Sequence, residues 1–154
     1  MEIKIDYNMG TAEFFVNLEA AADKSTYKGH FKVKCVLSPL DYIQSDATYR
    51  ELLGKTNPQF ANDYVAQLAY ALSQLKYRII SNPSWFDNNI NGIKGSNVDD
   101  KILLYILDKA IQSEEDYRNG IEEKYKKARD EVKEAIDSGK LNDGKQEEVD
   151  EEEW

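Results

Sequence analysis

Apolar and polar side chains alternate in two stretches near the start of the chain, from Glu2 to Tyr7 and from Thr26 to Leu37, which is the period-two pattern of half-buried β-strands. Between them, the stretch from Glu13 to Leu18 contains two phenylalanines and a valine, and we expect a strand there as well. Since a lone hairpin is marginal in water and three strands sharing an apolar face are not, we expect an antiparallel sheet. The third stretch is the most regular, and its polar face is basic, with Lys28, His30, Lys32 and Lys34.

The apolar spacing changes to three and four at Ser38, which predicts a helix. Serine caps exposed helical amides and proline suits the first turn, so Ser38 and Pro39 indicate where the helix begins. We expect it to run from about Pro39 to Leu53 and to end at Gly54. The side chains expected to face the core are Leu40, Ile43, Ala47 and Leu52.

A second helix is predicted to begin at Asn57-Pro58 and to end before Asn82-Pro83, because the residue before a proline avoids helical geometry. Its expected core positions are Ala61, Tyr64, Val65, Leu68, Leu72, Leu75 and Ile79. The stretch from Asn82 to Asn97 is rich in Asn, Ser and Gly and predicts a loop. We expect Trp85 and Phe86 to pin this loop by covering the end of the helical core.

The last helical pattern begins at Asn97 or Asp99, either of which can act as a cap. Apolar residues then recur at three and four, and charged Glu114 and Arg118 interrupt them. We expect a helix packed in the domain to about Tyr117 and a second, more exposed helix to about Ile136. The expected seam contains Leu104, Leu107, Ile111, Ile121, Tyr125, Ala128, Val132 and Ala135.

Charged residues are unevenly distributed along the chain. From Glu114 to Trp154 there are 16 acidic and 8 basic residues, which leaves 13 acidic and 12 basic residues before Glu114. The segment from Gly139 to Trp154 is strongly acidic and poor in apolar side chains, a composition typical of disorder. The sequence therefore predicts an α+β fold, with an N-terminal antiparallel β-sheet, a helical domain and a long C-terminal helix. We expect one domain over 1–118, an exposed helix over 119–138 and an acidic disordered tail over 139–154.

Composition excludes several kinds of chemistry. The chain has one cysteine, Cys35, and one histidine, His30, so it has neither an internal disulfide nor a cluster with zinc-ligand spacing. We expect Cys35 to be buried and inert and His30 to be solvated. The sequence shows no catalytic, cofactor or metal motif, and we expect no enzymatic activity.

Two classes of partner are also unexpected. The formal charge of -9 argues against unassisted binding to nucleic acid, which requires clustered Lys and Arg. No stretch approaches the roughly 18 uncharged apolar residues of a membrane span. With nucleic acid and membranes disfavoured, the sequence favours proteins as partners.

Candidate partner-binding residues lie on two helices. Ile121, Tyr125 and Val132 share one stripe of the exposed C-terminal helix, which must pack on the domain, on a second copy in weak self-association, or on another protein. Tyr70, Tyr77 and Arg78 lie off the apolar face of the second helix. They are either ordinary helix surface or a contact face, since tyrosine supplies large, rigid contact area.

Five local patterns follow one another between Thr26 and Arg118. They are Thr-Tyr-x-Gly-x-Phe-x-Val-Lys at Thr26 to Lys34, Leu-Ser-x-x-Asp at Leu37 to Asp41, Tyr-Arg-Glu-Leu-Leu-Gly at Tyr49 to Gly54, Leu-x-x-Arg-Ile with x-Pro-x-Trp-Phe at Leu75 to Phe86, and Asn-Val-Asp-Asp at Asn97 to Asp100. In this order the patterns resemble the tail assembly chaperones of tailed bacteriophages. The first 18 residues and the acidic tail are outside the resemblance.

The resemblance implies a non-enzymatic chaperone of the host cytoplasm that binds tape measure protein and tail tube subunits during assembly. It implies no catalytic residues. Two alternatives stay open: a minor virion component, such as an adaptor or decoration protein, and an acidic nucleic-acid mimic that inhibits a DNA-binding enzyme.

Overall fold

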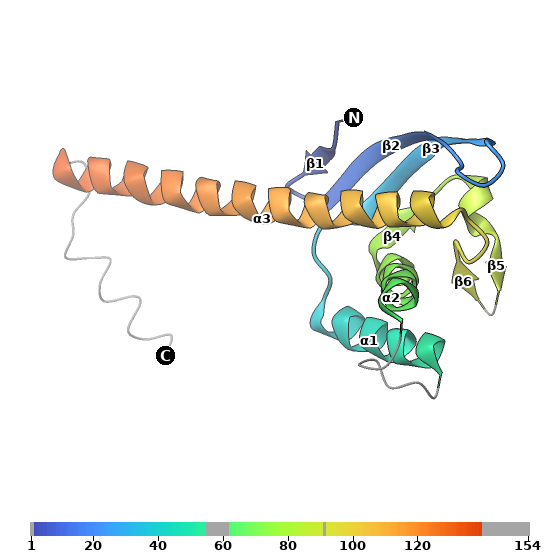
Figure 1. The fold of residues 1–154 in the computed structure, drawn as a ribbon. Helices are drawn as coiled ribbons and strands as arrows, with labels where there is room; N and C mark the ends of the chain where they lie inside the picture. The colour runs from blue at the N-terminus through green and yellow to red at the C-terminus, as the bar shows by residue number, and fades with distance from the viewer. Residues whose placement is uncertain (1, 55–61, 91, 140–154) are drawn as a thin grey trace. The chain divides into compact units, whose positions relative to one another are not determined.

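The computed structural model describes residues 2–54, 62–90 and 92–139. The fold is α+β as predicted, with an N-terminal antiparallel sheet followed by helices (Figure 1). The chain divides into two compact units, one ending at Tyr117 and the other beginning at Arg118. Except for Gly139, the predicted disordered tail over 139–154 lies outside the described residues.

The four-stranded sheet contains β1 (Lys4–Asp6), β2 (Thr11–Glu19), β3 (Thr26–Lys34) and β4 (Ile79–Ser81), in the order β1-β2-β3-β4. All neighbouring strands are antiparallel. Phe14 of β2 lies opposite Phe31 of β3, and their rings stack with centroids 5.7 Å apart. The alternation seen in the sequence therefore sets the register, because a shift by one residue would turn these rings to solvent.

The faces of β3 follow the sequence prediction. Its inward side chains and their continuation are buried, namely Phe31, Val33, Cys35 and Leu37. On the outward face Lys28 and His30 are exposed, and Lys32 and Lys34 are half-buried.

Helix α1 (Pro39–Leu53) has the bounds that the sequence predicts. The Ser38 side chain accepts a hydrogen bond from the backbone N–H of Asp41 at 3.1 Å. Gly54 ends the helix with a φ of 65°, a conformation that glycine adopts without steric cost.

Helix α2 (Asp63–Arg78) begins after Asn62, whose side chain accepts hydrogen bonds from the next turn. The predicted start at Asn57-Pro58 and the core position Ala61 lie outside the described residues. The predicted end is wrong, because the chain becomes extended at Ile79 and forms β4 against β3.

The loop after β4 contains a short 3-10 helix, η2 (Ser84–Asp87), and a small hairpin of β5 (Asn89–Ile90) and β6 (Ile93–Lys94). The Trp85 indole N–H donates to the backbone carbonyl of Lys28 at 2.8 Å. Phe86 is buried and meets Phe31 edge to face, with ring centroids 5.4 Å apart. The predicted pinning of the loop by these two aromatic residues is confirmed, and the contacts that pin it are with β3 of the sheet.

Helix α3 (Asp100–Asp137) is one continuous helix, so the expected break near Tyr117 is wrong. Charged side chains at Glu114 and Arg118 interrupt an apolar seam, but they do not oppose helical backbone geometry. The Asp99 carboxylate caps the helix by accepting from the backbone N–H of Lys101 at 3.0 Å.

The core lies between the sheet, α2 and the first half of α3 (Figure 1). The buried side chains of α3 are Ile102, Leu103, Ile106, Leu107, Ala110 and Ser113. The expected seam through Leu104 and Ile111 is therefore wrong by about one position, since Leu104 is half-buried and Ile111 is exposed.

Candidate protein-binding surface

Helix α1 turns its apolar side chains outward. Leu40 is 60% exposed and Ile43 is 67% exposed, and Ala47, one turn further on, is also exposed. By contrast, Ser45 is 2% exposed and Thr48 is buried. The prediction that Leu40, Ile43 and Ala47 face the core is wrong, and we call these three residues the outer face of α1.

Polar contacts with α2 explain this orientation. The Ser45 hydroxyl accepts a hydrogen bond from the Gln74 amide at 3.3 Å. The Thr48 and Tyr77 hydroxyl groups share a hydrogen bond of 3.0 Å. Since buried polar groups are costly without partners, these contacts favour the rotation of α1 that turns its outer face away from α2. Figure 1 shows α1 on the side of α2 remote from the sheet.

The Arg78 guanidinium lies inside the fold rather than on a contact face. Its side chain is 4% exposed; Nε donates to Gln74 at 3.1 Å, and Nη2 donates to Glu114 of α3 at 3.1 Å. Its Nη1 is buried with no hydrogen-bond partner among the described residues. The expectation that Arg78 contributes to an exposed surface is therefore corrected: the carboxylate of Glu114 compensates its charge in the interior.

Further contacts hold α1 at its start. The Tyr42 hydroxyl donates to Glu114 at 3.1 Å. Lys34 of β3 forms an ion pair with Asp41 at 3.1 Å, and the hydrogen bond from Lys34 lowers the pKa of the Asp41 carboxyl. Helix α1 is thus joined to α2, α3 and β3, so its outer face is presented by an anchored element.

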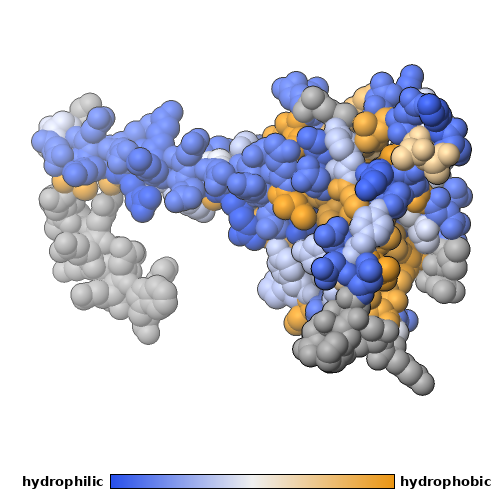
Figure 2. All heavy atoms as spheres, in the orientation of Figure 1, coloured by the Kyte–Doolittle hydropathy of each residue, from blue (hydrophilic) through white to orange (hydrophobic). Residues whose placement is uncertain are grey.

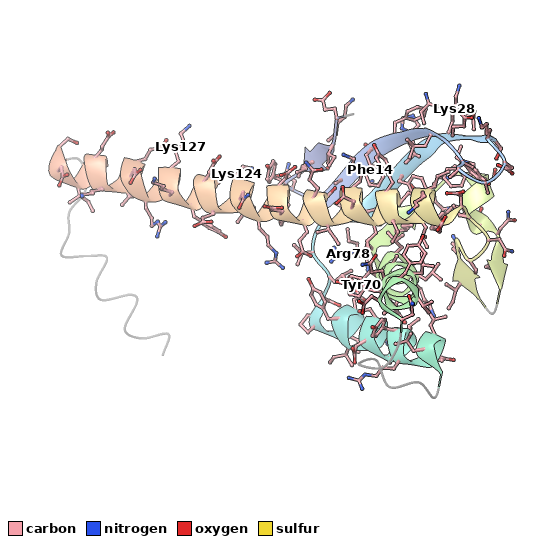
Figure 3. The ribbon with its side chains drawn as sticks, in the orientation of Figure 1. Phe14, Lys28, Tyr70, Arg78, Lys124 and Lys127 are labelled. Atoms are coloured by element: carbon pink, nitrogen blue, oxygen red, sulfur yellow. The ribbon has the colours of Figure 1, made fainter. Side chains whose placement is uncertain are left out.

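The two predicted tyrosines of α2 belong to the α1–α2 contact. The half-buried Tyr77 is bonded to Thr48, as described above. The Tyr70 ring meets Tyr49 of α1 edge to face, with centroids 6.3 Å apart, and keeps an exposed part. Figure 3 shows Tyr70 and Arg78 both projecting from α2. Of these three candidates, only Tyr70 has substantial surface to offer a partner.

The second unit carries the other predicted surface. Tyr125 is 68% exposed, Val132 is 43% exposed and Ile121 is half-buried. Figure 2 shows this part of α3 as mostly hydrophilic, with hydrophobic atoms confined to one edge, and also shows hydrophobic patches over the helical part of the first unit.

The outer face of α1 was not predictable from the sequence pattern. Its residues have the three-four spacing of a core-facing stripe, and a stripe on an exposed helix has the same spacing. The only local signal is that small hydroxyl residues, Ser45 and Thr48, occupy another side of the same helix. Their significance depends on Gln74 and Tyr77, which are 29 residues away in the chain.

The single cysteine and the single histidine of the chain lie on opposite faces of the sheet. Cys35 is fully buried, and this burial raises the pKa of its thiol to about 11. His30 is exposed and its ring lies against Phe15, with centroids 4.8 Å apart. Within the described residues, no three His, Cys, Asp or Glu side chains are grouped so as to hold a metal ion. In the same part of the chain, no helix combines the length and apolar character needed to cross a membrane.

Comparisons of this chain with protein family models, with curated proteins and with solved structures found no match. Its functional interpretation therefore depends on the surfaces described above and on the resemblance in sequence pattern.

Proposed function

We propose that this protein is a non-enzymatic assembly chaperone that binds a helical segment of a protein partner through the outer face of α1. The observation that carries the proposal is the orientation of that helix, with Leu40 and Ile43 exposed by 60% and 67% and Ser45 buried. Amphipathic helices bind partners by burying an apolar stripe, and α1 presents such a stripe on an anchored element.

The size of the surface suits a reversible contact. Each apolar side chain that becomes buried contributes roughly 25 cal/mol per Å² of apolar area. Two large side chains and one alanine provide a small patch, so binding would be exchangeable, as a chaperone that releases its client requires.

The sequence resemblance suggests the identity of the partners. We propose tape measure protein and tail tube subunits of a tailed phage as the clients, bound in the host cytoplasm. The resemblance implies clients with long amphipathic helices, which agrees with recognition of helices by the outer face of α1.

The test is co-expression of the full chain with the tape measure and tail tube proteins encoded in the same genome. Wild-type protein should co-purify with at least one of them, and the Leu40→Asp, Ile43→Asp double variant should not. The control is Met9→Asp, which places one such charge at a position where the side chain is 73% exposed elsewhere in the unit. Equal co-purification of all three proteins would contradict the role of the outer face.

Purified phage particles separate the chaperone from a minor virion component. A chaperone should be absent from them, whereas an adaptor or decoration protein should be present in a fixed ratio to the tail proteins. A genome without tail genes would contradict the phage assignment altogether.

A further inference from the structure

The exposed stripe of the second unit has the spacing of a coiled-coil seam. The spacing between consecutive members of the stripe alternates between four and three positions along α3. The members are Ile121, Tyr125, Ala128, Val132 and Ala135. In heptad terms Tyr125 and Val132 occupy a positions and the other three occupy d positions. Tyr125 is 68% exposed and Val132 is 43% exposed, and Ala128 is exposed as well. The stripe can therefore take a helical partner.

The charged residues beside the stripe indicate which partner this is. Glu122 and Arg129 occupy e positions, and Lys124 and Glu131 occupy g positions. All four are exposed. Lys124 is labelled on the second half of α3 in Figure 3. Charges at e and g positions determine the partner and the orientation of a coiled coil.

A parallel pair of these helices would be repulsive. In a parallel coiled coil, a g residue faces the e residue five positions later in the other helix. Lys124 of one copy would then face Arg129 of the other, and the two-fold axis would repeat this like-charge contact.

An antiparallel pair is attractive at the four charged flanking positions. In that orientation g residues face g residues and e residues face e residues. When Tyr125 of one copy lies opposite Ala128 of the other, Lys124 faces Glu131 and Glu122 faces Arg129. Two-fold symmetry produces each pair twice, so the four flanking charges are complementary in this alignment.

The same alignment matches the sizes of the seam residues. The large Tyr125 ring lies opposite the small side chain of Ala128, and Ile121 lies opposite Val132. Large residues facing small ones allow layers to interdigitate without voids. The flanking charges therefore select this alignment, and the two Tyr125–Ala128 layers are compatible with it.

We infer that residues 118–137 of two copies of this chain associate as an antiparallel coiled coil, through the seam and flanking charges defined above. We choose a second copy as the partner because the flanking charges of one copy complement those of an identical copy. A two-fold contact between identical surfaces requires such self-complementarity. The seam is short, so this dimer is weak and depends on protein concentration. The inference is independent of the proposed client binding, which uses a different helix.

The first test measures sedimentation of the full chain over concentrations from about 10 μM to about 1 mM. Wild-type protein should show a monomer–dimer equilibrium. Lys124→Glu converts two attractive pairs into two repulsive ones and should raise the dimer Kd at least about tenfold. Adding Glu131→Lys exchanges the charges and should restore the wild-type Kd. Circular dichroism checks that each variant keeps its helix.

The second test determines orientation by disulfide formation. An equal mixture of Ile121→Cys and Val132→Cys should form a mixed disulfide, because the alignment places these positions opposite each other. Ile121→Cys alone should not cross-link, since an 11-residue offset separates the two copies by about 16 Å. The wild-type protein, with Cys35 buried, is the control.

Three results would overturn the inference. The first is a monomer at every concentration, the second is a dimer that the charge exchange leaves unaffected, and the third is efficient cross-linking between two copies of Ile121→Cys.

Discussion

Cys35 shows how burial controls the chemistry of one side chain. Its thiol is fully buried, and desolvation raises its pKa to about 11. Since the thiolate is the reactive species, we expect native protein at pH 8 to react with an aromatic disulfide reagent far more slowly than protein unfolded in urea. The measurement is the rate of absorbance change with and without urea. Fast labelling of the native protein would show that the end of β3 opens to solvent.

The same shift has a consequence for stability. The folded state holds the Cys35 proton more tightly than the unfolded state. The contribution of the protonated thiol to the free energy of unfolding is therefore complete below the ordinary thiol pKa of 9.0. It should be lost as pH rises through about 11. The free energies of unfolding of wild type and Cys35→Ala should therefore approach each other as the pH rises through this window.

Gly29 is required by a close approach of the backbone to a proline ring. A Cβ atom at Gly29 would lie 2.4 Å from the Cβ atom of Pro83. We expect Gly29→Ala to lower the free energy of unfolding by roughly 1–3 kcal/mol, because a ring cannot yield by changing rotamer. Urea denaturation measures this, with Lys28→Ala on the exposed face as a control expected within about 0.5 kcal/mol. A Gly29→Ala protein as stable as wild type would mean that the loop after β4 moves freely.

At the scale of the element, the buried ion pair between Arg78 and Glu114 joins α2 to α3. Glu114→Ala would leave the Arg78 guanidinium, 4% exposed, without its carboxylate. We expect a loss of about 3–5 kcal/mol in the free energy of unfolding, since an uncompensated buried charge is strongly destabilising. Chemical denaturation followed by circular dichroism is the measurement.

An exposed ion pair within α1 is the matched control. Asp46 and Arg50 of α1 form a pair at 2.9 Å, and both side chains are more than half exposed. Asp46→Ala should cost about 0–1 kcal/mol. If the two variants lost similar stability, the surroundings of the Arg78 guanidinium would be hydrated rather than dry.

At the scale of the whole molecule, the exposed stripe of the second unit should be separable from the fold of the first. We expect the double variant Ile121→Asp, Val132→Asp to keep the melting temperature of the domain and to lose self-association. Calorimetry and sedimentation on the same samples measure both properties. A fall in stability of several kcal/mol, as for buried core substitutions, would show that the stripe is intramolecular core. If neither property changed, the helix would be a spacer, and Tyr70 would be the next surface to test.

Local sequence by itself determined the parts of this protein that depend on near neighbours in the chain. The alternation through β2 and β3 set the buried faces around Phe14 and Phe31, because side chains in a strand point to opposite faces in turn. Ser38 and Gly54 set the bounds of α1, because caps act within one turn. The pinned loop at Trp85 and Phe86 was also predictable, since large aromatic side chains seek burial.

Only the tertiary structure decided which side of α1 faces solvent, where α2 ends and where Arg78 lies. Hydrogen bonds to Gln74 and Tyr77, 29 residues away, turn Leu40 and Ile43 outward. Pairing with β3 converts Ile79–Ser81 into a strand. Glu114, 36 residues beyond Arg78, makes its burial tolerable. In each case the free energy of the observed conformation depends on a partner that is distant in sequence, so no local pattern could reveal that conformation.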